Sequence, residues 1–303
     1  MQTNHQEITK LIKQDLKKVS PKPIQNFDLI SAKSGVYVYR CLFDGIPAVV
    51  KYFENEDDKR EILNYRILAQ HDIPTIKTPA LGESAFVMED ITVSEHWRLG
   101  MAEDFKDADV TKALARWYFK LHENGSAVPE LNTLWFEFDD ITEESLKTLI
   151  ARFPEAGELF QFVLVRYEKL RELIYKPAFT LTYNDFYWSN FVVRKDKQAA
   201  MMFDYNLLGK GYRASDFRNV CWGLSEEAKT AFVDEYGRLY FEKHGQTRTE
   251  AEKEEERIDD VAAPIFSLLC AFLKKDSIPD WAKKPDSEYL DGSLLAKAKQ
   301  LLM

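Results

Sequence analysis

The spacing of apolar residues changes once along this chain, and the change restricts the fold class. Over residues 27–53 apolar and polar side chains alternate with a period of two, and Asp44-Gly45 interrupts the alternation with a hairpin signal. From about residue 108 apolar side chains recur at helical spacing instead. A β-rich part followed by a helical part is the pattern of an α+β protein.

The β-rich part also contains two helical patterns. Apolar residues predict an amphipathic helix over 6–19 and a second helix over 57–72, which is followed by a strand pair over 78–91. We therefore divide the chain into a small N-terminal antiparallel-β lobe, residues 1–91, and a larger helical C-terminal lobe, residues 92–303.

The C-terminal part carries several long helical patterns. We expect helices over 108–125 and 156–173, and a helix between them with Asp140 as its N-cap and Glu143 three residues on. The charged run over 247–260 is typical of a solvated helix face or a mobile loop.

Composition excludes some functions and locations. The chain has 303 residues and a formal net charge of −9, without the basic cluster that nucleic-acid binding requires. Its three cysteines form no Cys-x-x-Cys pair, which favours a reducing compartment. The N-terminus lacks the apolar segment of a signal peptide, and the longest apolar stretch, around Pro264, is too short to span a bilayer. We expect a cytoplasmic protein without nucleic-acid or membrane partners.

A polar turn rich in aromatics lies between two short strands in the C-terminal part. It reads "YNDFYWSN" and places Asp185 and Asn190 at the spacing D-x-x-x-x-N, while Asp204 ends the next apolar strand. Phosphoryl transfer needs a carboxylate near the attacking hydroxyl and oxygen ligands for Mg²⁺. Because a carboxylate at a buried strand end is costly without a cation, we expect Asp204 to bind the metal. The aromatics between Asp185 and Asn190 are expected to fix their separation.

Two further charges complete this set. Lys51 ends an apolar run in a predicted strand, and Glu61 lies on the core-facing side of the helix that follows. Each residue alone is typical of a surface charge. Together they predict an ion pair that holds the lysine for the phosphates of a nucleotide.

Other nucleotide motifs fit less well. Residues 209–214, "GKGYRA", match G-x-G-x-x-A after a strand, but the β-α alternation of a dinucleotide-binding domain does not follow. Neither G-x-x-x-x-G-K-[ST] nor G-x-S-x-G occurs, so a P-loop NTPase or an α/β-hydrolase is not supported.

The ordered motifs resemble the aminoglycoside phosphotransferase family, which shares the protein-kinase-like fold with choline kinases. The family signature, H-G-D-x-x-x-x-N, stands here as Tyr183-Asn184-Asp185 through Asn190, and Asp204 ends the apolar strand that follows. Outside the signature, Leu121-His122 ends a helix as in the family, and Asp216 matches an aspartate that is usually structural. The resemblance covers roughly residues 28–240.

The resemblance implies a bilobal kinase-like fold, Mg²⁺, and ATP or GTP as co-substrate. It implies a phosphotransferase that moves the γ-phosphate to a hydroxyl of a small molecule. The implied roles are catalysis by Asp185, metal binding by Asn190 and Asp204, phosphate contact by Lys51 oriented by Glu61, a phosphate-covering loop at Gly35, and backbone contacts to the base near Glu89 and Ile91.

The sequence leaves the acceptor, the nucleotide preference and the oligomeric state open. Candidate residues for a cationic hydroxyl compound, such as an antibiotic or an amino alcohol, are Trp135, Glu137, Asp139, Asp140, Glu226 and Glu227, although solvated charges around core aromatics fit equally. Tyr183, in place of the family histidine, motivates a second hypothesis, a nucleotide-binding pseudokinase without transferase activity.

Overall fold

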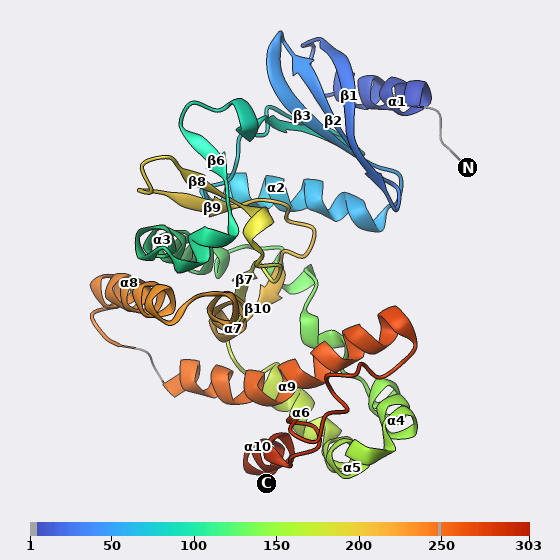
Figure 1. Ribbon diagram of the computed structural model, residues 1–303, viewed down its shortest axis with the longest axis vertical. Coiled ribbons are helices and arrows are strands. Elements are labelled where there is room, and N and C mark those ends of the chain that lie inside the picture. The colour runs from blue at the N-terminus through green and yellow to red at the C-terminus, as the bar shows by residue number, and fades with distance from the viewer. Residues whose placement is uncertain (1–4, 248–249) are drawn as a thin grey trace. The chain divides into compact units, whose positions relative to one another are not determined.

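The computed structural model describes residues 5–247 and 250–303 (Figure 1). Contacts divide the chain into two compact units, which are described separately. The first comprises Met1–Val128, Asp185–Leu208 and Val220–Leu239, and the second comprises Pro129–Asn184, Gly209–Asn219 and Tyr240–Met303. The expected α+β class is confirmed, because an antiparallel sheet forms near the N-terminus and helices dominate the rest of the described chain.

A five-stranded antiparallel sheet, in the order β1-β2-β3-β5-β4, forms the N-terminal part of the first unit. The elements here are α1 (His5–Lys17), β1 (Ile24–Lys33), β2 (Val36–Phe43), β3 (Ile46–Phe53), α2 (Arg60–Gln70), β4 (Ala80–Leu81) and β5 (Ala85–Glu89). The predicted hairpin is confirmed: Phe43 pairs with Ile46, and Asp44 and Gly45 have φ of 55° and 77°. Positive φ at both turn residues is the geometry that Asp-Gly favours.

The first helix is anchored to this sheet at its C-terminal end. Ile8, Ile12 and Leu16 are buried in a core cluster that also contains strand residues. Asp15 Oδ2 accepts three backbone N–H groups, from Glu83, Ser84 and Ala85, at 3.0, 2.8 and 2.9 Å. The carboxylate of α1 therefore caps the turn between β4 and β5.

A second, three-stranded sheet of the first unit carries part of the polar turn. Its strands β6 (Trp97–Leu99), β8 (Phe191–Arg194) and β9 (Ala200–Met202) are antiparallel in the order β6-β8-β9. Helix α3 (Ala108–Gly125) packs against β9. The predicted helix over 108–125 is thus confirmed, and Asp107 caps its N-terminus by accepting from Asp109 N and Val110 N.

The second unit is mainly helical around one large apolar cluster. Its elements are α4 (Glu143–Arg152), α5 (Gly157–Val165), α6 (Tyr167–Ile174), β7 (Thr180–Thr182), β10 (Gly209–Gly211), α9 (Glu250–Lys275) and α10 (Ser293–Leu302), while α7 (Arg213–Gly223) and α8 (Glu226–His244) each belong to both units. The glycines of "GKGYRA" form β10 and pair with β7, so they are strand residues.

Two helix boundaries differ from the sequence-based prediction. Helix α4 begins at Glu143, because Thr142 and Ser145 cap it reciprocally and Asp140 lies in the preceding 3-10 turn. The long helix predicted over 156–173 is broken at Arg166, whose φ of −114° and ψ of 21° separate α5 from α6.

The charged run over 247–260 also differs from its prediction. Arg248 and Thr249 lie outside the described residues, and most of the remainder forms the start of α9. Glu252, Glu255 and Asp259 are buried on this helix, so the run is not a fully solvated face. Among the described residues, none of the helices is both long enough and apolar enough to span a membrane.

Candidate active site

Lys51 bridges two carboxylates in the first unit. It projects from β3, a central strand, and its Nζ lies 2.6 Å from Glu61 Oε2 and 2.8 Å from Asp204 Oδ1. Glu61 stands in the first turn of α2 and is only 1% exposed. The predicted ion pair between Lys51 and Glu61 is therefore present, and Asp204 joins it.

Burial and charge act in opposite directions on this cluster. Burial alone would lower the pKa of Lys51, but Glu61 and Asp204 raise it above its usual value. Burial raises the pKa of Glu61 to about 7, and Lys51 only partly offsets this effect. Lys51 therefore stays protonated and positively charged at neutral pH, as contact with phosphate requires.

Asp204 follows β9 at a left-handed backbone position. Its φ is 63°, a conformation that costs roughly 1–2 kcal/mol in a residue with a Cβ. The N–H of the preceding Phe203 donates to Asn190 O at 2.9 Å. This bond aligns Asn190, which directly precedes β8, with the end of β9, and so places the two predicted metal ligands at the same end of the hairpin.

Asp185 and Asn190 contact each other directly. Asn190 Nδ2 donates to Asp185 Oδ2 at 2.9 Å and to Asp185 O at 3.2 Å, while Ser189 Oγ donates to Asn190 Oδ1 at 3.0 Å. Of the aromatics between them, Phe186 stacks on Phe105 with ring centroids 4.9 Å apart. Tyr187 and Trp188 are exposed, so Phe186 alone provides the expected packing.

The predicted metal ligands suit Mg²⁺. A carboxylate from Asp204 and a carboxamide oxygen from Asn190 are hard oxygen donors, and the Asp204 side chain is 34% exposed. Residues 5–247 and 250–303 contain no group of three His, Cys, Asp or Glu side chains that could hold a metal by themselves. Mg²⁺ is commonly held by one or two carboxylates together with substrate phosphates, so this small donor set fits a metal that arrives with a nucleotide.

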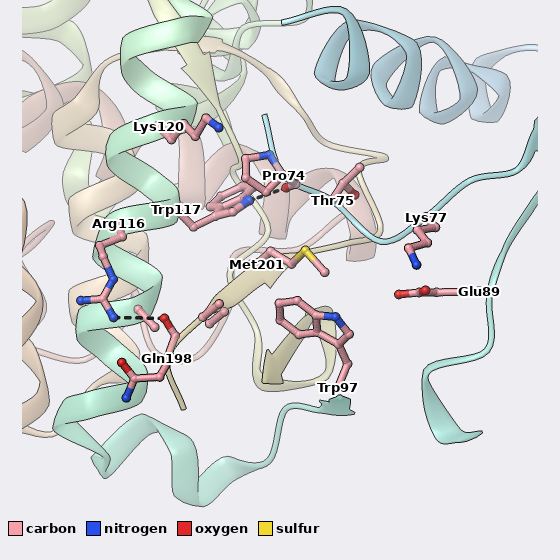
Figure 2. Close-up of a pocket in the computed structure, with 13 residues that line it drawn as sticks. Pro74, Thr75, Lys77, Glu89, Trp97, Arg116, Trp117, Lys120, Gln198 and Met201 are labelled. Carbon is pink, nitrogen blue, oxygen red and sulfur yellow. Dashed lines mark hydrogen bonds between the residues drawn. The ribbon is translucent and has the colours of Figure 1, made fainter. Parts of the chain in front are cut away.

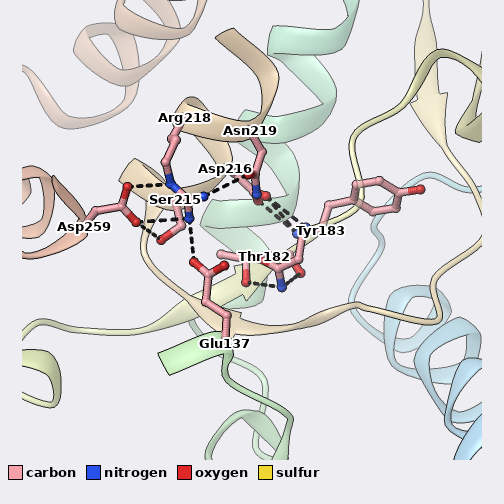
Figure 3. Close-up of polar contacts among 9 residues, drawn as sticks. Glu137, Thr182, Tyr183, Ser215, Asp216, Arg218, Asn219 and Asp259 are labelled. Atoms are coloured by element: carbon pink, nitrogen blue, oxygen red, sulfur yellow. Dashed lines mark hydrogen bonds and ion pairs between the residues drawn. The ribbon is translucent and has the colours of Figure 1, made fainter. Parts of the chain in front are cut away.

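In the second unit, Asp216 holds the backbone of Tyr183 and Asn184, which stand where the family signature has His-Gly (Figure 3). It is buried, and its two oxygens accept from Tyr183 N at 3.1 and 3.0 Å, while Asn184 N donates to Oδ1 at 3.2 Å. Asn184 has φ of 66°, and its side-chain amide donates to Thr182 O and Oγ1. Asparagine tolerates this conformation better than most residues, so Asn184 can adopt a backbone conformation that glycine otherwise favours.

A buried ion network in the second unit was not foreseen from the sequence. Arg218 Nη2 donates to Glu137 Oε1 at 2.7 Å and its Nε donates to Asp259 Oδ2 at 2.7 Å, while Ser215 Oγ donates to Asp259 Oδ1 (Figure 3). Burial raises the pKa of Glu137 to about 7, although Arg218 opposes the shift. Glu137, a candidate for substrate contact, is therefore engaged in the interior, and Asp139 accepts from Tyr175 Oη.

The remaining predicted nucleotide contacts lie on the five-stranded sheet and just beyond it. Gly35 lies in the turn between β1 and β2 with φ of 82°, a left-handed conformation that favours glycine. Glu89 ends β5, and its N–H already donates to Lys77 O at 3.0 Å. Ile91 starts a 3-10 turn directly afterwards. Contact of these residues with a nucleotide stays a prediction.

Comparison with solved structures shows the same fold at low sequence identity. The choline kinase LicA from Streptococcus pneumoniae is 14% identical, with a TM-score of 0.56 over 97% of this chain and 99% of that chain. The macrolide 2′-phosphotransferase MphH from Brachybacterium faecium is 12% identical, with a TM-score of 0.56 over 97% of each chain. Spectinomycin phosphotransferase APH(9)-Ia, solved with ADP and spectinomycin, is 13% identical, with a TM-score of 0.53 over 97% of this chain and 98% of that chain.

Sequence comparison gives the family. No curated protein sequence matches the chain. The sequence profile of the phosphotransferase enzyme family matches residues 34–252, which span every predicted site residue from Gly35 to Asp204. The chain therefore belongs to the phosphotransferase enzyme family.

Proposed function

We propose that this protein is a nucleotide-dependent small-molecule kinase that transfers the γ-phosphate of ATP or GTP to a hydroxyl group. The observation that carries the proposal is the position of Lys51 between Glu61 and Asp204. The same unit contains the hydrogen-bonded pair of Asp185 and Asn190. Family membership supports phosphotransfer, and this arrangement supplies the parts that phosphotransfer from a nucleotide needs.

In the proposed reaction Asp185 accepts the proton of the acceptor hydroxyl. A positioned general base contributes about 10²–10⁴ in rate. The hydrogen bonds from Asn190 Nδ2 to both the carboxylate and the carbonyl of Asp185 restrict the rotamer of that base. Asn190 therefore acts on catalysis in two ways, as a proposed metal ligand and as a support for Asp185.

Lys51 and the metal ligands act on the nucleotide. Mg²⁺, when bound, would neutralise charge on the phosphate oxygens, and Asn190 and Asp204 would hold it. Lys51 would contact the α- and β-phosphates while Glu61 continues to orient it. Because Asp204 is now shared with Lys51, we expect nucleotide binding to weaken that contact and to retain the contact with the buried Glu61.

The acceptor is proposed only as a small molecule with a hydroxyl group. The similar structures include enzymes named for choline, a macrolide and spectinomycin, so a cationic antibiotic or an amino alcohol is the first class to test. Cytoplasmic location and the absence of nucleic-acid and membrane partners stay predictions from the sequence.

The decisive experiment measures nucleotide consumption with Mg²⁺ over a panel of aminoglycosides, macrolides, choline analogues and sugars, with ATP and GTP in parallel. We expect at least one acceptor to stimulate consumption and to gain a phosphate detectable by mass spectrometry. Asp185→Asn should lower turnover on that acceptor by about 10²–10⁴ while nucleotide binding persists. Wild-type turnover in the Asp185→Asn protein would exclude Asp185 as the base.

The alternative, a nucleotide-binding pseudokinase, gives a different result in the same assay. It predicts a thermal shift with nucleotide but no stimulation by any acceptor. This alternative is motivated by Tyr183, which replaces the family histidine. The N–H of Tyr183 donates to Asp216, so this part of the loop is anchored without the histidine. The structure therefore gives no separate support to this alternative.

A further inference from the structure

A pocket in the first unit lies among α3, Trp97 of β6, the start of β9 and the segment containing Pro74 (Figure 2). The Glu89 side chain lines the pocket, which has a volume of about 450 Å³. Neither Lys51 nor Asp204 is among its lining residues, so this pocket is separate from the proposed phosphate site.

The floor of the pocket is aromatic and apolar. Trp117 of α3 is buried, and its Nε1 donates to Pro74 O at 2.7 Å, which fixes the indole ring. Met201 and Trp97 line the pocket as well, and Figure 2 shows them next to each other, with Met201 nearer to Pro74. Indole and thioether surfaces of this kind favour a flat, apolar ligand group.

The rim of the pocket is cationic. Lys77, Arg116 and Lys120 line it, opposed by the carboxylate of Glu89. Arg116 is already engaged by Glu235 Oε1 at 2.8 Å and by Gln198 O at 3.3 Å. Lys77 and Lys120 make no ion pair within the described part of the chain. Figure 2 shows Lys120 and Lys77 on opposite sides of the pocket, with Pro74 and Thr75 between them, so each lysine gives one end of the pocket a positive charge in a protein with a net charge of −9.

We propose that this pocket binds a small aromatic anion, a flat ring system that carries one carboxylate, sulfonate or phosphate group. The rings would lie against Trp97, above the floor that Trp117 forms, and the anionic group would meet the lysine at one end of the pocket, Lys77 or Lys120. The volume falls within the range of about 300–1,000 Å³ that is typical of small-molecule sites. The proposal goes beyond the proposed kinase activity, because it requires neither a nucleotide nor an acceptor.

The strand that lines the pocket also leads to the proposed metal ligand. Met201 belongs to β9, and Asp204 follows that strand within two residues of its end. A ligand held against Met201 therefore contacts the same hairpin as the nucleotide site. We expect any coupling between the two sites to be reciprocal, as thermodynamic linkage requires.

The test uses anilinonaphthalene sulfonate as an aromatic anion and follows its fluorescence with the full-length protein. We expect saturable binding of one probe per chain, and binding at least about tenfold weaker in Lys77→Glu/Lys120→Glu. Lys112→Glu, on an exposed position of α3 outside the pocket, is the matched control and should bind like the wild type. Trp97→Ala should weaken binding without changing the net charge.

Two further measurements keep the proposal testable even if a variant is unstable. The uncharged N-phenylnaphthylamine should bind the wild-type protein at least about tenfold more weakly than the sulfonate. Increasing ADP with Mg²⁺ should change the affinity for the sulfonate by a factor that levels off, as coupling between two sites requires, and should not lower it in proportion to the ADP concentration. Equal affinity for the two probes, competitive displacement by ADP, or unchanged binding in the double lysine variant would each overturn the proposal, whatever the kinase assay shows.

Discussion

Asn190 donates a hydrogen bond of 2.9 Å to the carboxylate of Asp185. The two residues lie five positions apart in sequence, and the amide also reaches the carbonyl of Asp185. The D-x-x-x-x-N spacing therefore does more than place a proposed base and a proposed metal ligand in one turn. It allows one amide side chain to close the turn and to hold the proposed base, which makes the functions of the two residues interdependent.

This contact predicts a large effect of Asn190→Ala. The variant removes both the hydrogen bonds to Asp185 and a proposed metal ligand, and a misplacement of about 1 Å can cost about 10² in rate. We expect turnover to fall by at least about 10² and the Mg²⁺ concentration for half-maximal rate to rise. Ser189→Ala, which removes only the bond to Asn190 Oδ1, is the control and should retain most activity. Near-normal turnover in Asn190→Ala would contradict both roles.

The sequence was most informative where one local pattern determines the geometry. The Asp44-Gly45 turn and the strand period predict the hairpin, and Lys51 after an apolar run, taken together with Glu61 on the core-facing side of the next helix, predicts their ion pair. Its contact with Asp204 depends on two segments far apart in sequence. The order of the motifs suggested a shared site, but no spacing along the chain determines that distance.

The sequence was least informative about charges that become buried. Arg218, Glu137 and Asp259 come from three distant segments, and each alone is typical of a surface position. The same reason explains why the charged start of α9 was predicted to be solvated. The start of α4 was predicted wrongly for a different reason. Asp140 and Thr142 are both good N-cap residues, and the reciprocal bonds with Ser145 favour Thr142.

Removal of the Lys51 cation should destabilise the protein in a pH-dependent way. In Lys51→Met, Glu61 stays buried without its partner, and breaking a buried pair costs about 3–5 kcal/mol. Burial raises the pKa of Glu61, so its protonated form avoids this cost at low pH and the stability is lost as pH rises through the folded pKa. Urea unfolding should therefore show a larger loss near pH 8 than near pH 5. Addition of Glu61→Gln should recover most of the loss near pH 8, and a pH-independent loss would refute this explanation.

Asn184 should tolerate glycine better than alanine. Both variants lose the side-chain bonds to Thr182, but the φ of 66° suits glycine, whereas an alanine there also meets a strain of roughly 1–2 kcal/mol. We expect both variants to lower the free energy of unfolding, and Asn184→Ala to lower it by about 1 kcal/mol more than Asn184→Gly. Chemical denaturation compares the two variants. Equal stability of the alanine and glycine proteins would show that the left-handed conformation is not required.

The network around Arg218 predicts that the free energy of unfolding depends on pH through the titration of Glu137. Burial raises the pKa of Glu137 to about 7, above the value of about 4.5 expected in the unfolded chain, despite the contact with Arg218. The folded state therefore binds this proton more tightly. The stability that protonated Glu137 contributes is fully present below the pKa of the unfolded chain and is lost as pH rises through the pKa of the folded state.

Glu137→Gln removes that proton while keeping an oxygen acceptor for Arg218. We expect the free energy of unfolding of the wild type, relative to this variant, to decrease by about 1–3 kcal/mol as pH rises from about 4.5 to about 7. Glu143→Gln is the control, because Glu143 is exposed on α4 and pairs only with Lys147 in the described chain, so its curve should stay parallel to that of the wild type. A Glu137→Gln curve that also runs parallel would mean that Glu137 stays ionised beside Arg218 throughout this range.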